Sequence, residues 1–101
     1  MPDYIYKSSG QYLGFMDGGN ICSWDGKFLG WIEGGYVWDA SGQFKGQIKQ
    51  INGHYYVLKN MYALPPLPKM PKLNPLPVIS IPAPQPIIPP ITLDIGWTDG
   101  L

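Results

Sequence analysis

Apolar positions recur along residues 4–60 of the chain at a fixed interval of 16 residues. Three sets of equivalent positions keep the same type of side chain: Ile5, Ile21 and Val37; Tyr12, Phe28 and Phe44; and Met16, Ile32 and Ile48. The runs between turns are short and rich in Tyr, Trp, Phe and Ile, a composition typical of strands. None of them has the period of a helix. The pattern therefore predicts a repeated all-β unit.

Each repeat contains two turn sequences. One set pairs a polar residue with glycine and the other is Gly-Gly or Asn-Gly: Ser9-Gly10, Asp25-Gly26 and Ser41-Gly42; Gly18-Gly19, Gly34-Gly35 and Asn52-Gly53. The second kind favours two-residue hairpin turns, because a type I′ turn needs positive φ at both central residues. We therefore expect each repeat to be a β-hairpin that another tight turn joins to the next.

A fourth repeat is predicted to be split by a proline-rich stretch. Residues 56–59 match residues 36–39, and the missing partner strand is found only at residues 95–100, which are similar to residues 29–34. Closing the sheet removes the two open edges of a hairpin meander. We expect a closed eight-stranded antiparallel barrel with Trp97 beside Tyr6 and Thr98 beside Ile5. The predicted parts are a hairpin-repeat barrel (1–63), a proline-rich arm (64–90) and a closing strand (91–101).

Strand alternation sorts the side chains into two faces. We assign the face that keeps its residue types in every repeat to the barrel interior: Tyr12, Gly14, Met16, Ile21, Phe28, Gly30, Ile32, Val37, Phe44, Gly46, Ile48 and Val57. Glycine suits the centre of that face, because strands in a narrow barrel approach closely. The other face is expected outside: Tyr6, Leu13, Phe15, Cys22, Trp24, Leu29, Trp31, Trp38, Lys45, Gln47, Ile95 and Trp97.

The repeat resembles the four-fold β-flower family, whose members are small, shallow, eight-stranded barrels of four hairpin petals. The resemblance is carried by the run Gly14–Gly19, which recurs as Gly30–Gly35, by the petal turns, and by a proline-rich insertion before a closing Gly96-Trp97 strand. It implies a closed all-β barrel with pseudo-four-fold symmetry. It implies no particular biochemical function.

Eleven of the twelve prolines lie between Pro65 and Pro90, a composition that is typical of a disordered linker. Apolar residues nevertheless fall on every third position: Leu64, Leu67, Met70, Leu73, Leu76 and Ile79. Polyproline II has three residues per turn, so these side chains form one stripe. We predict that this stripe docks on the aromatic outer face of the barrel, in the same chain or in a second copy.

Composition limits the possible partners. The formal net charge of the 101 residues is +0, which gives no electrostatic basis for binding nucleic acid and little repulsion between two copies. No apolar run approaches the length of a membrane span. The first residues lack the basic and apolar regions of a signal peptide, so a cytoplasmic location is expected.

Candidate catalytic and metal-binding residues are few. His54 has no identifiable nucleophile or orienting partner, and Cys22, the single cysteine, is expected to be a small apolar filler. Asp17, Glu33 and Asp99 precede equivalent glycines, but Lys49 occupies the fourth such place. We therefore expect no enzyme, metal site or cofactor.

The expected function is a non-enzymatic binding or assembly module whose aromatic face engages a proline-rich segment, with self-association or a protein partner through the arm. The candidate binding residues are Tyr6, Phe15, Trp24, Trp31, Trp38 and Trp97. Two alternatives stay open. One is a barrel that holds a lipid or another small apolar ligand, and the other is an aromatic cage for a choline-like cation, which would use cation–π attraction.

Overall fold

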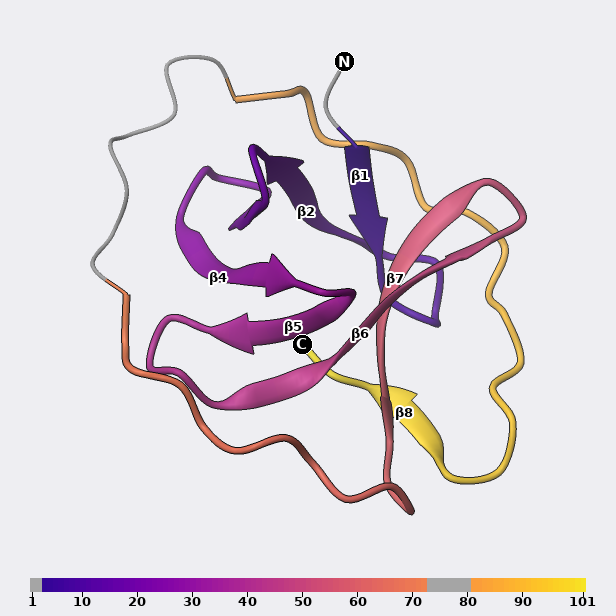
Figure 1. Cartoon of the computed structure of the whole chain (residues 1–101). Helices are drawn as coiled ribbons and strands as arrows, with labels where there is room; N and C mark the ends of the chain where they lie inside the picture. Colours follow the sequence, from indigo (N-terminus) through magenta and orange to yellow (C-terminus); the bar gives the residue numbers. More distant parts are fainter. Residues whose placement is uncertain (1–2, 73–80) are drawn as a thin grey trace.

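Eight strands form one continuous sheet in which each strand is antiparallel to the next along the chain (Figure 1). The computed structural model describes residues 3–72 and 81–101. The strands are β1 Asp3–Tyr6, β2 Tyr12–Asp17, β3 Asn20–Ser23, β4 Phe28–Glu33, β5 Tyr36–Asp39, β6 Phe44–Ile51, β7 His54–Asn60 and β8 Trp97–Asp99. Nowhere in the described residues is there a helix with the length and apolar character to cross a membrane.

The predicted hairpins are confirmed. β2–β3, β4–β5 and β6–β7 are joined by two-residue turns in which both central residues have positive φ. At Gly34 and Gly35 the φ values are 58° and 83°, and at Asn52 and Gly53 they are 53° and 81°. These are the values that a type I′ turn requires, and they match the right-handed twist of the flanking strands.

The barrel interior is filled by one branched side chain from each repeat. Ile5, Ile21, Val37 and Val57 are at most 2% exposed and contact one another. Glycines allow the strands to come this close: a Cβ on Gly30 would lie 2.0 Å from the carbonyl oxygen of Trp38. The predicted interior face is correct here and for three further side chains that pack on this cluster, namely Met16, Ile32 and Ile48.

A β-bulge recurs near the start of β2, β4 and β6, and it changes which side chains face the barrel interior there. Ile5 pairs with Gly14 but Tyr6 pairs with Tyr12, which leaves Leu13 as an extra residue. The same irregularity leaves Leu29 and Lys45 extra in the next two repeats. An extra residue moves the following side chains to the opposite face of the sheet.

The prediction that Tyr12, Phe28 and Phe44 point inward is therefore wrong. The ring of Tyr12 lies against Tyr6, with centroids 5.9 Å apart, and the ring of Phe44 lies 5.5 Å from that of Trp38. Phe28 holds the equivalent place opposite Cys22. In exchange Leu13 and Leu29, predicted outside, pack against the interior cluster.

The ring closes through β1 and β7, which pair in parallel at Ile5–Tyr55 and Tyr6–Tyr56. Seven strands therefore make the closed barrel, and β8 is an additional strand that pairs with residues 58–60 of β7, farther along the same edge that β1 occupies. The predicted eight-stranded antiparallel ring is wrong in this respect. Trp97 pairs with Asn60 and Thr98 with Lys59, not with Tyr6 and Ile5.

The last strand sits four residues out of the predicted register. Gly96 has a φ of 91°, like Gly42 in its turn, so it does not correspond to Gly30. Gly100 takes that place instead: its N–H donates to the carbonyl of Val57 at 3.0 Å, and a Cβ there would lie 1.9 Å from the carbonyl oxygen of Lys45. Gly-x-x-x-Gly spacing, present at Gly10, Gly26 and Gly42 as well as at Gly96, is the sequence feature that would have revealed this register.

Candidate binding surfaces

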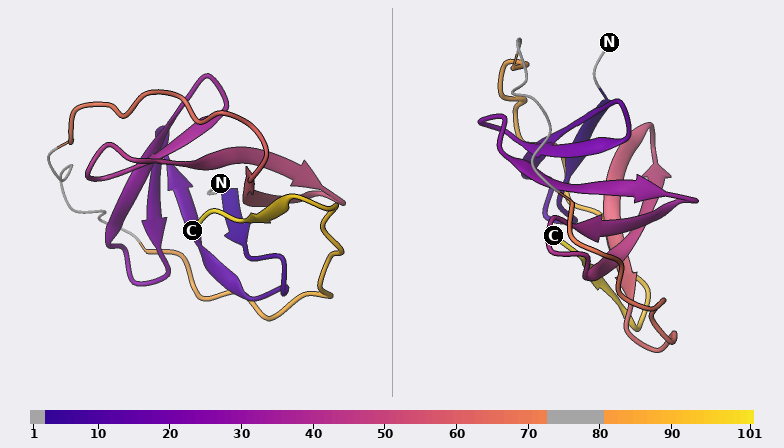
Figure 2. Two further views of the ribbon diagram at one scale, coloured as in Figure 1. Left: turned by 90° about the horizontal axis from the view of Figure 1, so that it is seen from below. Right: turned by 60° about the vertical axis from the view of Figure 1, so that its left-hand side comes forward.

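Two described segments between β7 and β8, residues 61–72 and 81–96, pass outside the ring of strands (Figures 1 and 2). We call these two segments the belt. Its backbone donates hydrogen bonds to equivalent turns of two repeats: Lys69 N–H to Gly42 O at 2.8 Å, and Ile88 N–H to Gly10 O at 2.9 Å. Next to these, Lys72 donates to Ala40 O and Ile91 to Ser8 O. The belt is thus held to the barrel by backbone hydrogen bonds at two equivalent turns.

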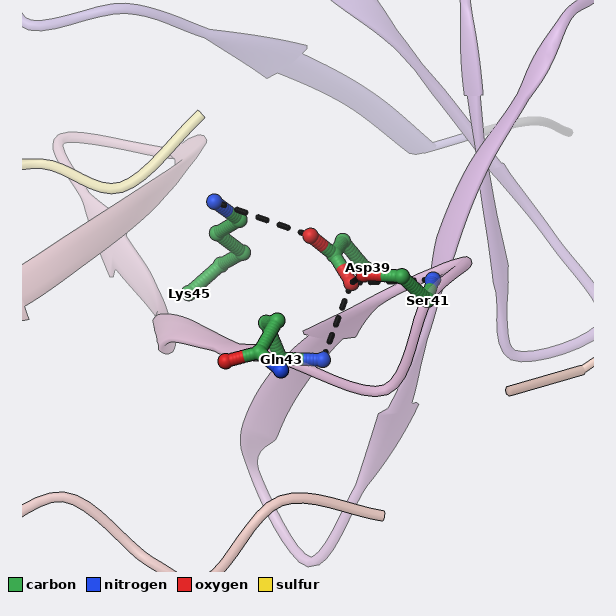
Figure 3. Close-up of polar contacts among 4 residues, drawn as sticks. All are labelled: Asp39, Ser41, Gln43 and Lys45. Carbon is green, nitrogen blue, oxygen red and sulfur yellow. Dashed lines mark hydrogen bonds and ion pairs between the residues drawn. The ribbon is translucent and has the colours of Figure 1, made fainter. Parts of the chain in front are cut away.

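A side-chain network around Asp39 fixes the turn that receives Lys69 (Figure 3). Oδ1 of Asp39 accepts hydrogen bonds from Ser41 N–H at 3.0 Å, Ser41 Oγ at 2.6 Å and Gln43 N–H at 2.9 Å. Nζ of Lys45 lies 3.6 Å from Oδ2. Partial burial alone would raise the pKa of Asp39, but these donors and the lysine charge lower it. The carboxylate therefore stays ionised and holds the turn.

The glycines of these turns leave room for the belt backbone. A Cβ on Gly42 would lie 1.8 Å from the carbonyl oxygen of Lys69, and a Cβ on Gly10 would lie 1.8 Å from that of Ile88. In the equivalent turn between them, a Cβ on Gly26 would lie 2.8 Å from the side chain of Ile81. The sequence indicates that these glycines lie in tight turns, but it does not indicate that the turns contact the belt.

Two belt lysines cover two buried indoles of the outer face. Nζ of Lys69 lies 5.1 Å from the ring centroid of Trp38, and Nζ of Lys72 lies 4.7 Å from that of Trp31. Both distances are in the range of cation–π attraction. Trp31 and Trp38 are 2% and 3% exposed. Both indoles are thus buried, and each has a belt ammonium over its ring.

Glu33 joins the same cluster. Its Oε2 lies 2.8 Å from Nζ of Lys69, and its Oε1 accepts a hydrogen bond from Nε1 of Trp31 at 3.1 Å. The hydrogen bond from Lys69, followed by the charges of Lys69 and Lys72 and the bond from Trp31, lowers the pKa of the Glu33 carboxyl. An acid, two ammonium groups and two indoles thus form one connected contact between barrel and belt.

The predicted apolar stripe faces solvent where it is described. Leu64 is 96% exposed and Leu67 and Met70 are each 86% exposed, so the prediction that they dock on the barrel of the same chain is wrong. Docking on a second copy stays a prediction. The lysines between them face the barrel, because Glu33 and the indole rings attract cations more than they attract leucine. The other three stripe positions, Leu73, Leu76 and Ile79, lie outside the described residues.

The six candidate binding residues fall into three groups. Phe15, Trp31 and Trp38 are buried, as is Tyr6, which packs with Tyr56 and Leu58. Trp97 is half-buried against that second cluster. Trp24 is 58% exposed.

An open cavity of about 630 Å³ lies beside the long β6–β7 hairpin. Lys49 and Ile51 of β6, Leu58 of β7, Leu93 of the belt and Trp97 of β8 line it. Nζ of Lys49 lies 4.3 Å from the ring centroid of Trp97. Sequence reasoning missed this cavity because it depends on where the belt returns to the barrel.

Three candidate catalytic and metal-binding residues are packed, buried or hydrogen-bonded within the fold. The ring of His54 packs on that of Tyr6, with centroids 5.1 Å apart. Cys22 is 2% exposed, and burial, followed by the charge of Asp17, raises the pKa of its thiol. Asp99 accepts hydrogen bonds from the N–H and Oγ of Ser8 at 2.8 and 2.7 Å, so it is not the equivalent of Glu33.

These features define a small all-β barrel protein whose outer aromatic face is crossed by a proline-rich belt. A family model described as 4-fold beta flower protein matches residues 1–99. The chain therefore belongs to the four-fold β-flower family. Neither the comparison with curated proteins nor the comparison with solved structures finds a match.

Proposed function

We propose that this protein is a non-enzymatic binding module whose outer aromatic face holds a proline-rich segment in a polyproline II conformation. In the free chain that segment is the belt itself. When the belt dissociates from the barrel, the same face binds the equivalent segment of a second copy. The module then mediates self-assembly. The observation that carries the proposal is the placement of Lys69 and Lys72 over Trp38 and Trp31.

The belt contacts are of a strength that permits exchange. A cation–π contact at an exposed site stabilises by about 0.5–1 kcal/mol, and an exposed ion pair such as that of Lys69 with Glu33 contributes about 0–1 kcal/mol. Ordering each belt residue costs roughly 1–2 kcal/mol in backbone entropy. The docked belt is thus weakly held, so a competing segment of the same chemistry displaces it.

A peptide-binding experiment tests the proposal. A fluorescent peptide with the sequence of residues 64–72 is titrated with the full chain and with the Lys69→Glu, Lys72→Glu double variant, and anisotropy is recorded. The variant's own belt is repelled by Glu33, so we expect the variant to bind the peptide more tightly than the parent chain does. A peptide with glutamate at both lysine positions is the control. Equal binding of the two peptides, or binding to neither protein, overturns the proposal.

The barrel interior is a poor place for the alternative apolar ligand. Ile5, Ile21 and Val37 are 0% exposed there and Leu101 packs against the same cluster. The aromatic cage is also disfavoured, because belt ammonium groups already lie over Trp31 and Trp38.

A further inference from the structure

The third repeat has a lysine, Lys49, where the second repeat has an acid, Glu33. Lys49 stands 16 residues after Glu33, at the equivalent position of β6, which continues for two more residues to Ile51. Glu33 receives the ammonium of Lys69 from the belt. Among residues 3–72 and 81–101 the ion pairs are Lys45–Asp39 and Lys69–Glu33, so no described carboxylate pairs with Lys49. The cavity of about 630 Å³ lies beside Lys49, between this repeat and residues 92–94 of the belt.

The cavity walls combine this cation with apolar surface. Leu58 is 3% exposed and Ile51 and Leu93 are half-buried, and the indole of Trp97 closes one side. Thr92 and Gln50 add hydrogen-bonding groups. Four of the eight lining residues are thus apolar and four are polar. A volume between about 300 and 1,000 Å³ is typical of small-molecule sites.

We propose that this cavity binds a small organic monocarboxylate whose body is apolar. The carboxylate pairs with Lys49, and the body lies against Ile51, Leu58 and Trp97. Asp94, which is exposed and lines the same cavity, repels a second negative charge and so selects a monoanion over a dianion. The inference does not depend on belt exchange, since neither Lys69 nor Lys72 lines the cavity.

Aromatic acids and fatty acids share this chemistry, and the experiment distinguishes them. The full chain is titrated separately with 2-naphthoate and with decanoate, and the indole N–H resonance of Trp97 is followed by NMR. The neutral counterparts 2-naphthylmethanol and decanol show what the carboxylate contributes. We expect at least one acid to bind about fivefold to tenfold more tightly than its alcohol, the gain expected of one partly desolvated ion pair.

Variants place the effect on the cavity. Lys49→Gln should lower the affinity for the acid to that for the alcohol, and Lys49→Arg should restore most of it. Lys27→Gln, which removes an exposed lysine far along the chain from the cavity, is the matched control. Asp94→Asn should improve binding of the dianion 2-naphthyl phosphate severalfold.

Three outcomes would overturn the proposal. They are equal affinity for acid and alcohol in the parent chain, unchanged acid binding by Lys49→Gln, and failure of both acids to shift the Trp97 resonance at millimolar concentration. If Lys49→Gln does not fold, the comparison of acid with alcohol on the parent chain and on Lys49→Arg still decides the matter.

Discussion

A side chain on Gly42 has no room because the carbonyl oxygen of Lys69 would lie 1.8 Å from its Cβ. The same distance relates Gly10 to Ile88, on the belt's return path. The two contacts lie in equivalent turns, so the belt makes the same backbone contact with two pseudo-symmetric repeats of the barrel. The docked belt therefore lies in direct backbone contact with these turns, and changes to the turns should weaken its docking.

Replacing Gly42 by alanine tests this relationship. The change introduces both a residue at φ 91° and the clash with Lys69, so we expect a loss of roughly 2 kcal/mol or more in the free energy of unfolding, together with release of the belt. Gly34→Ala is the control, since φ there is 58° but nothing lies within 4 Å of the new Cβ. It should cost only about 1 kcal/mol. Equal costs in urea titrations would contradict a packed belt.

Much of the barrel could be predicted from the sequence because its determinants are local. The 16-residue period and the glycine pairs identify hairpins and the centre of the core, Ile21 and Val37 included. The bulges could not be predicted in this way, because Leu13 and Leu29 look like any other apolar strand residues. Closure by parallel β1–β7 pairing is a long-range contact that leaves no local pattern.

The candidate site was predicted less well, because its determinants are pairwise. The aromatic face was identified, but the every-third-residue leucines suggested the wrong side of the belt. The side that docks is set by Glu33, whose role depends on Lys69, a residue 36 positions later. The cavity near Lys49 depends on three separate segments and could not be predicted.

Acid should loosen the belt through Glu33. Its pKa is lowered in the folded chain from an ordinary value of 4.5, so its contribution to stability is fully present above pH 4.5. That contribution is lost as the pH falls below 4.5 and through the folded pKa, because the unfolded chain takes up the proton first. We expect tryptophan emission to shift to the red in this window, and the shift to be smaller at high salt, which screens the exposed pair at every pH. Glu33→Gln should lack this step, and an identical acid profile for that variant would contradict the assignment.

The belt lysines should matter more than the belt leucines. Lys69→Ala combined with Lys72→Ala removes two cation–π contacts and the ion pair, so we expect a loss of about 1–2 kcal/mol and a red shift of tryptophan emission. Leu64→Ser combined with Leu67→Ser, at sites that are 96% and 86% exposed, should change stability by less than about 0.5 kcal/mol. The reverse order in thermal melts would restore the leucine stripe as the docking surface.

Cys22 should react with thiol reagents only when the barrel opens. Its side chain is 2% exposed, and its raised pKa leaves little thiolate at neutral pH. We expect Ellman's reagent to modify the native thiol at least about 100-fold more slowly than the urea-unfolded one. An added cysteine at the exposed Ser9, in a Cys22→Ala background, is the control and should react at the rate of the unfolded chain.

The attachment of β8 depends on Asp99, which joins the last strand to the turn between β1 and β2. Both of its oxygens accept hydrogen bonds from Ser8, at 2.8 and 2.7 Å, across 91 residues of sequence. Asp99→Ala removes two bonds to a charged acceptor, so we expect a loss of about 1.5–3 kcal/mol. Asp99→Asn still offers one oxygen to the Ser8 N–H and should lose about half as much.

The location of the lost stability in Asp99→Ala shows whether β8 or the whole ring of strands is affected. Seven strands close the barrel without β8, because β1 pairs with β7 at Ile5–Tyr55 and Tyr6–Tyr56. In Asp99→Ala, amide hydrogen exchange should therefore quicken at residues 58–60 and 97–100, while β2 to β5 keep their protection. Truncation after Pro90, which also removes Trp97 and Leu101 from their clusters, should give the same pattern more strongly. Uniform loss of protection across all strands would mean that β8 is required for closure, contrary to the parallel β1–β7 pairing.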